Sequence, residues 1–90
     1  MNYKRKTFGA KQCHEEQYTN GMRIFISYAT PVGAYVPGLG YLKTSDYYSR
    51  TTTRHLSVWS KDNEYPMTQE TSERELWGLR DECLRVNYGE

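Results

Sequence analysis

The stretch MRIFISYATPVGAYVPGLGYLKT, at residues 22–44, has the clearest structural pattern in the chain. Two sets of residues alternate in the first part of this stretch: Met22, Ile24, Ile26 and Tyr28 form one set, and Arg23, Phe25, Ser27 and Ala29 form the other. This two-residue period is typical of a β-strand that is partly covered on both faces. Pro37-Gly38 supplies the fixed φ and the positive φ that a type II turn requires. We therefore predict a β-hairpin region over 22–44, with a returning strand that begins at Gly40.

A helix over 72–86 is the second strong prediction. Ser72 and Glu75 have the spacing of a capping box. Apolar residues then recur at helical spacing, at Leu76, Leu79, Cys83 and Val86. Gly78 lowers the helix propensity by about 1 kcal/mol, and we expect it to mark a close contact.

Two other segments are less distinct. Ser49 or Thr51 can cap a short helix over 50–60. Residues 1–21 form a variable N-terminal segment, in which Ala10 to Tyr18 can make a short helix that Asn20-Gly21 ends.

These elements predict a single α+β domain over residues 1–90. We expect a small antiparallel sheet of three to four strands, covered by two or three helices. The helix at 72–86 is expected to be the main cover, which gives a two-layer sandwich.

Composition limits the class of protein. The 90 residues are 37% hydrophobic and include nine tyrosines and two tryptophans. No apolar run is long enough to cross a membrane, and no secretory signal follows the basic N-terminus. Residues 1–54 contain eight basic and three acidic residues, whereas residues 55–90 contain four basic and eight acidic ones. If these halves form different faces the molecule is dipolar; otherwise the charges only serve solubility.

Metal binding and catalysis have little support. Cys13, His14, His55 and Cys83 are the soft metal ligands, and they lack the paired spacing of a zinc site. No nucleophile, base and orienting group can be assembled from the pattern. Glu15-Glu16 are expected to be solvated. We predict no enzymatic activity, no metal and no cofactor.

The densest local feature is YYSRTTTRH, at residues 47–55. Arginines one helical turn apart, together with hydroxyls at a helix N-terminus, favour a phosphate or carboxylate. In the alternative interpretation, the tyrosines pack under the sheet and the hydroxyls only cap the helix. The predicted binding residues are Tyr47, Tyr48, Arg50, Arg54, Lys43 and Arg23.

The same residues carry a resemblance to a known family. The run at 26–32 and the motif YYSRTTxxH at 47–55 resemble a small domain of unknown function found in phage-encoded proteins. The resemblance covers residues 22–60. It implies a viral origin and, by class, similarity to anti-CRISPR proteins that act in the host bacterial cytoplasm.

Three hypotheses for function follow. The leading one is a phage-type inhibitor that evades host defence by occupying a protein or ribonucleoprotein surface, such as a CRISPR effector, and blocking nucleic-acid access. An acidic face can serve the same purpose, and its members are Glu70, Glu73, Glu75, Asp81 and Glu82. The alternatives are direct nucleic-acid binding by the basic N-terminal half and a role in virion assembly. A membrane or a small-molecule substrate is not expected as a partner.

Overall fold

The computed structural model describes residues 3–8, 12–46, 49–63 and 69–89. Within these residues, six strands form one mixed sheet in the order of the chain, and two helices follow β5 and β6. The strands are β1 (Tyr3–Thr7), β2 (Cys13–Tyr18), β3 (Arg23–Ser27), β4 (Thr30–Val36), β5 (Gly40–Thr44) and β6 (Gln69–Thr71). The helices are α1 (Arg50–Asn63) and α2 (Glu73–Gly89). Strands β1 to β5 are antiparallel neighbours, whereas β6 runs parallel to β5 after the α1 crossover.

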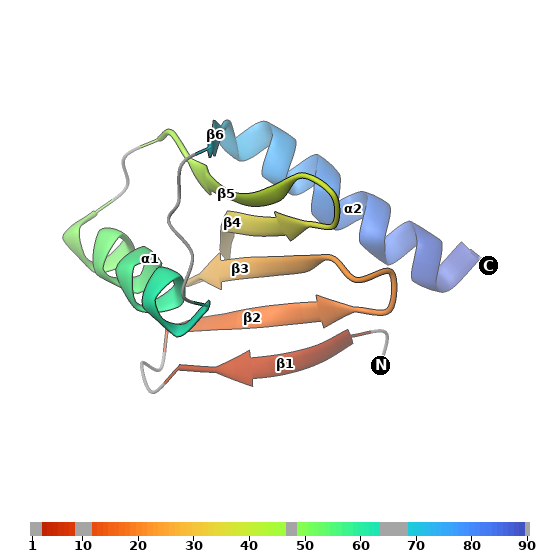
Figure 1. The fold of residues 1–90 in the computed structure, drawn as a ribbon, viewed down its shortest axis with the longest axis horizontal. Helices are drawn as coiled ribbons and strands as arrows, with labels where there is room; N and C mark the ends of the chain where they lie inside the picture. Colours follow the sequence, from red (N-terminus) through yellow and green to blue (C-terminus); the bar gives the residue numbers. More distant parts are fainter. Residues whose placement is uncertain (1–2, 9–11, 47–48, 64–68, 90) are drawn as a thin grey trace.

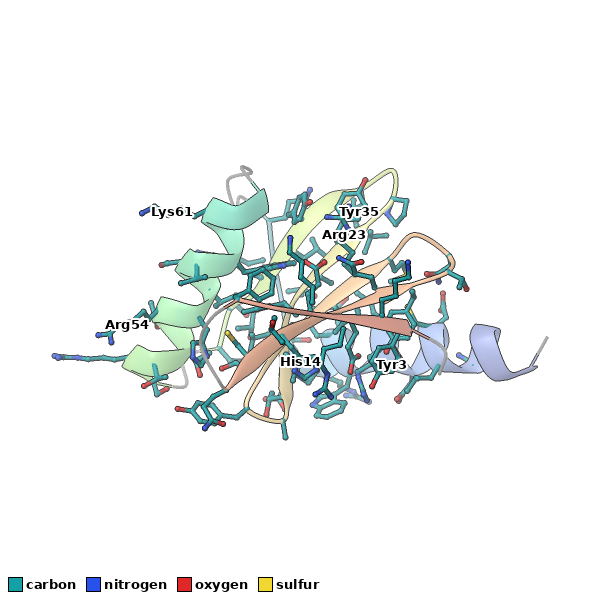
Figure 2. All side chains as sticks on the ribbon, turned by 90° about the horizontal axis from the view of Figure 1, so that it is seen from below. Tyr3, His14, Arg23, Tyr35, Arg54 and Lys61 are labelled. Atoms are coloured by element: carbon teal, nitrogen blue, oxygen red, sulfur yellow. The ribbon has the colours of Figure 1, made fainter. Side chains whose placement is uncertain are left out.

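The predicted sheet of three to four antiparallel strands is wrong. The sheet has six strands and is mixed, and its two helices lie on opposite faces (Figure 1). The view turned by 90° shows α1 on one side of the sheet and α2 on the other (Figure 2). The architecture is therefore three layers, helix–sheet–helix, in place of the expected two.

The two cores meet at β3. Ile24 and Ile26 face α2, whereas Phe25 faces α1, and all three are at most 4% exposed. The prediction that this strand is covered on both faces is confirmed. The α2 core consists of Tyr18, Met22, Ile24, Ile26, Ala34, Leu76 and Cys83. The α1 core consists of Cys13, Phe25, Val32, Tyr41 and Trp59.

The helix expected within residues 10–18 is not formed, because Cys13–Tyr18 is β2. Odd-numbered residues of β2 face α1 and even-numbered residues face α2. The charged side chains of Glu15 and Glu16 occupy two of these inward positions, at 0% and 2% exposure. The expectation that they are solvated is therefore wrong. Their polar character also concealed the alternation of the strand, because glutamate favours a helix locally while tertiary contacts decide otherwise.

The β4–β5 hairpin is formed as predicted. The backbone N–H of Leu39 donates to the carbonyl of Val36 at 2.9 Å, which closes the turn around Pro37-Gly38. Gly38 has a φ of 87°, the positive value that position requires.

Serine residues begin both helices. The Ser49 hydroxyl accepts from the N–H of Thr52 at 3.1 Å, and Ser72 accepts from the N–H of Glu75 at 3.2 Å. Gly78, however, has open space around it, so the expected close contact there is wrong. The Val86 side chain lies outside the described residues. Of the described helices, neither combines the length and the apolar character needed to cross a membrane.

Candidate functional site

An open groove of about 550 Å³ is lined by α1 and by one residue of β5. Lys43 lines it from the sheet. The α1 residues that line it are Thr53, Arg54, Leu56, Ser57, Val58, Ser60 and Lys61. The groove thus combines cations at its rim, hydroxyl groups along its wall and an apolar strip, which is a combination that suits a macromolecular partner.

The cations of the groove point outward. Arg54 and Lys61 extend from α1 away from the sheet (Figure 2), and Arg50 precedes Arg54 by one turn. All three are exposed, and within the described residues no ion pair engages them. Lys43 lies 3.8 Å from Glu70, but both side chains are more than one third exposed, so this pair contributes little. The positive charge of the groove remains available to an external anion.

Trp59 holds α1 against the sheet. Its ring stacks on Phe25 with centroids 4.9 Å apart and planes within 5°. Its indole N–H donates to the Glu15 carboxylate at 2.7 Å. Gly33 makes this approach possible, because a β-carbon there would overlap the Trp59 ring. The helix that presents the groove is therefore anchored at a buried, hydrogen-bonded position.

A buried polar network fixes the start of α1. The Ser27 hydroxyl lies 2.9 Å from Nδ1 of His55 and 3.1 Å from the Thr52 hydroxyl. The Ser49 hydroxyl donates to Thr52 at 3.3 Å. Burial, and then the charge of Arg54, lowers the pKa of His55. Three residues of the YYSRTTxxH motif are thus held inward, and this orients Arg50 and Arg54 outward.

Tyr28 is a further candidate that the sequence did not indicate. It has a φ of 59°, a strained value for a tyrosine, and its side chain is 53% exposed. Its ring lies 5.8 Å from that of His55. Tyr28 is therefore an exposed aromatic in a strained turn beside the α1 network, although it does not line the groove.

The predicted binding residues separate into three groups. Arg54 and Lys43 line the groove, and Arg50 lies one helical turn before Arg54, outside the lining. Arg23 is on the same side of the sheet, where it lies over the Tyr35 ring at 5.2 Å and donates to the Tyr41 hydroxyl at 3.3 Å. Tyr47 and Tyr48 lie outside the described residues.

Sequence reasoning missed Lys61, Leu56 and Val58. Lys61 follows Arg54 by seven residues, which is two helical turns. Its position on the same side of α1 as Arg54 could therefore have been predicted from the sequence. The 36% exposure of the Val58 side chain could not be predicted from the sequence, because it depends on how α1 packs against the sheet.

Of the predicted acidic residues, Glu73, Glu75, Asp81 and Glu82 belong to α2, whereas Glu70 lies on β6. Glu70 pairs with Lys43 beside the groove, and Glu73 accepts from the indole N–H of Trp77 at 2.9 Å. The remaining three, Glu75, Asp81 and Glu82, are exposed on α2 among the arginines of that helix.

Charge is nevertheless divided between the two sides of the sheet. Among the described side chains, seven basic and two acidic ones lie on the α1 side, whereas four basic and six acidic ones lie on the α2 side. The α1 side has Lys4, Lys6, Arg23, Lys43, Arg50, Arg54 and Lys61 with Glu15 and Glu70. The α2 side has Arg5, Arg74, Arg80 and Arg85 with Glu16, Asp46, Glu73, Glu75, Asp81 and Glu82. The molecule is dipolar across its sheet, and α1 lies on the basic side.

A buried ion pair holds the opposite helix. Two nitrogens of Arg80 donate to the two oxygens of Glu16, at 2.8 and 3.1 Å, and the Tyr18 hydroxyl donates to Glu16 at 2.7 Å. Burial acts to raise the pKa of Glu16, but the bonds from Arg80 and Tyr18 outweigh it, so this pKa lies below its ordinary value. His14 lies 3.6 Å from Glu16, and burial and the charge of Arg5 lower the pKa of His14.

These pKa shifts predict acid sensitivity. Because the pKa values of His14 and His55 are lowered in the folded chain, the unfolded chain binds more protons as the pH falls below the ordinary histidine value of 6.5. The free energy of unfolding should therefore fall as pH drops from 6.5, by at most about 1.4 kcal/mol per pH unit for each histidine. Glu16 adds a further loss below 4.5, as pH falls through its lowered folded pKa. Urea denaturation at pH 7.5, 6.5 and 5.5 measures the histidine effect, and equal stability at all three would contradict it.

The candidate metal ligands and catalytic groups are placed apart. Cys13 and His55 lie on the α1 side of the sheet, whereas His14 and Cys83 lie on the α2 side. In the part of the chain that the structure describes, no three metal-ligating side chains gather. Ser27 contacts His55 but is 2% exposed and shares its hydroxyl with Thr52, which is the arrangement of a structural link.

Sequence comparison places the chain in a family. The model of a family of unknown function, DUF8033, matches residues 1–77. The chain belongs to this family. The match extends beyond the 22–60 range of the expected resemblance and includes all six strands, α1 and the first turn of α2. Among curated proteins and solved structures, none matches the chain.

Proposed function

We propose that this protein is a small binding protein that docks the α1 side of its sheet on a negatively charged macromolecular surface. The observation that carries the proposal is the groove with Arg54, Lys61 and Lys43 around an apolar strip. Arginine is enriched at the energetic centres of protein interfaces, and exposed cations steer an anionic partner toward them. The anchored Trp59 and the buried network below α1 support the proposal, because they reduce the ordering that binding would require.

We infer that the partner is a host defence complex, such as a CRISPR effector, and that the protein is a phage-type inhibitor that blocks nucleic-acid access to it. The support is the resemblance of residues 22–60 to phage-encoded domains. A basic face suits an acidic protein patch or the exposed RNA of a ribonucleoprotein.

Affinity capture from a bacterial host lysate tests the docking surface. Arg50→Glu/Arg54→Glu reverses two exposed charges on α1 and is expected to lower recovery of the partner at least tenfold. Arg74→Glu/Arg85→Glu makes the same change of charge on exposed positions of α2, so it is the matched control and should recover the partner as the native chain does. Equal recovery by both double variants, with the fold intact by circular dichroism, would overturn the surface assignment.

Direct nucleic-acid binding is the second candidate. The observation that favours it is the excess of basic side chains on the α1 side, which reaches from Lys61 on α1 to Lys4 and Lys6 on β1. Gel shift with generic single-stranded RNA and DNA at about 50 and about 200 mM salt tests it, because phosphate contacts weaken steeply with salt. A salt-sensitive shift that Arg50→Glu/Arg54→Glu removes would make nucleic acid the partner. The absence of a shift at both salt concentrations would favour a protein as the partner of the α1 side.

A further inference from the structure

Strand β1 forms one edge of the sheet, and its register with β2 shows which backbone groups face outward. The N–H of Tyr18 donates to the carbonyl of Met22 at 2.9 Å, so the backbone groups of Tyr18 face β3. Backbone N–H and carbonyl groups alternate in direction along a strand. The backbone groups of even-numbered β2 residues therefore point toward β3, and those of odd-numbered β2 residues point toward β1.

The same alternation assigns the groups of β1. Lys4 and Lys6 are opposite Gln17 and Glu15, so their backbone groups bond to β2. Tyr3, Arg5 and Thr7 are opposite even-numbered residues, so their N–H and carbonyl groups point away from the sheet. Three residues of β1 thus present the donors and acceptors that an added strand needs.

The charges of the side chains on this edge determine which kind of strand can pair with it. Lys4, Arg5 and Lys6 are three consecutive exposed cations, with the lysines on the α1 side and Arg5 on the α2 side. Like charges directly opposite each other destabilise a strand pair, so a second copy of this edge is repelled. A strand with acidic residues would instead meet an opposite charge on whichever face those residues occupy.

We propose that the β1 edge accepts an extended acidic peptide segment, which adds to the sheet as a further strand. The backbone groups of Tyr3, Arg5 and Thr7 supply the hydrogen bonds, and the charges of Lys4, Arg5 and Lys6 supply the selectivity. This goes beyond the proposed function, because it uses an edge of the sheet that is separate from the α1 groove.

Three synthetic octapeptides test the proposal with the full chain. (Glu-Val)₄ has the charge and can form a strand. (Lys-Val)₄ can form a strand but has the wrong charge, and (Glu-Pro)₄ has the charge but lacks half of the N–H groups. Fluorescence anisotropy should show binding of (Glu-Val)₄ at least about tenfold tighter than binding of either control. Binding of (Glu-Pro)₄ equal to that of (Glu-Val)₄ would reduce the edge to a charged surface and overturn the proposal.

Amide hydrogen exchange locates the added strand. On addition of (Glu-Val)₄ to the ¹⁵N-labelled chain, the amides of Tyr3, Arg5 and Thr7 should gain protection. The amides of Lys4 and Lys6 should change little, because they already bond to β2. Protection at α1 amides, with none at Tyr3, Arg5 and Thr7, would place the peptide elsewhere.

Two variants of Arg5 separate charge from hydrogen bonding. Arg5→Gln removes only the charge and should weaken (Glu-Val)₄ binding a few-fold, whereas Arg5→Pro also removes the outward N–H and should weaken it about tenfold more. Arg85→Gln removes an exposed cation of α2, outside both proposed surfaces, and should leave this affinity unchanged. Equal affinities of Arg5→Gln and Arg5→Pro would overturn strand addition, and the (Glu-Pro)₄ comparison decides the question if Arg5→Pro fails to fold.

Discussion

Replacing Gly33 with alanine is expected to lower the free energy of unfolding by about 3 kcal/mol or more, a large share of the stability of a 90-residue domain. The added β-carbon would overlap the ring of Trp59 and would lie 3.1 Å from two of its carbons. That ring cannot move aside easily. It is 0% exposed, stacks on Phe25 and donates a hydrogen bond to the buried Glu15. Either α1 shifts outward or β4 distorts, and each loses packing in the α1 core.

Urea denaturation of three variants measures this effect. Gly78→Ala is the control, because it adds the same methyl group in open space on a helix and should stabilise the chain by about 0.5–1 kcal/mol. The pair Gly33→Ala/Trp59→Leu should lose less stability than the sum of its two single changes, because the shortened side chain makes room for the methyl group. If the Gly33→Ala variant has the same urea midpoint as the native chain, α1 is not held by Trp59 in the way the structure shows.

The same substitution also bears on function. Because Trp59 anchors the helix that presents Arg54 and Lys61, a displaced α1 should weaken capture of a partner even where the fold survives. A stable Gly33→Ala chain with undiminished capture would argue against the α1 groove as the docking surface.

The elements that sequence predicted well are those with local causes. Pro37-Gly38 determines its turn through its own φ angles, and Ser49 and Ser72 cap helices through bonds three residues away. The strand predicted within 22–28, covered on both faces, could be recognised because both of its alternating sets of side chains include apolar residues. These signals need no knowledge of the rest of the fold.

The elements that were missed have distant causes. A helix was expected within residues 10–18, with Glu15 and Glu16 solvated. Instead, the Glu15 carboxylate accepts a hydrogen bond from Trp59, 44 residues away, and the Glu16 carboxylate accepts one from Arg80, 64 residues away. No local pattern shows that two adjacent acidic residues on a strand hold two helices on opposite faces. The three-residue β6 is equally hidden, because its parallel pairing with β5 depends on the α1 crossover.

The candidate site divides in the same way. Arg50 and Arg54 could be assigned to one stripe of a helix from their spacing alone. That Lys43 lines a groove together with Arg54 depends on where α1 lies against the sheet, and the stacking of Arg23 on Tyr35 depends on the β3–β4 register. The division of charge between the two faces also required the sheet, because charged residues close in sequence, such as Arg5 and Lys6, point to opposite sides.

Breaking the Glu16–Arg80 pair is expected to have the second large effect. Arg80→Leu would leave a carboxylate that is 2% exposed without its cation, and loss of a buried partner costs about 3–5 kcal/mol. About 3 kcal/mol is the better expectation, because Arg80 keeps 24% of its side chain exposed and water can reach the site. Arg85→Leu removes an exposed arginine from the same helix and should change stability by no more than about 0.5 kcal/mol.

The double variant Glu16→Leu/Arg80→Leu distinguishes a structural link from a stabilising bond. It removes both charges together, so it should lose clearly less stability than the sum of Glu16→Leu and Arg80→Leu. Some loss should remain, because the buried Tyr18 hydroxyl then has no carboxylate to accept its hydrogen bond. Additive losses in urea denaturation would mean that the two side chains do not depend on each other. In that case α2 would be held by its apolar stripe alone, through residues such as Leu76 and Cys83, and the low-pH loss assigned to Glu16 would have to come from other groups.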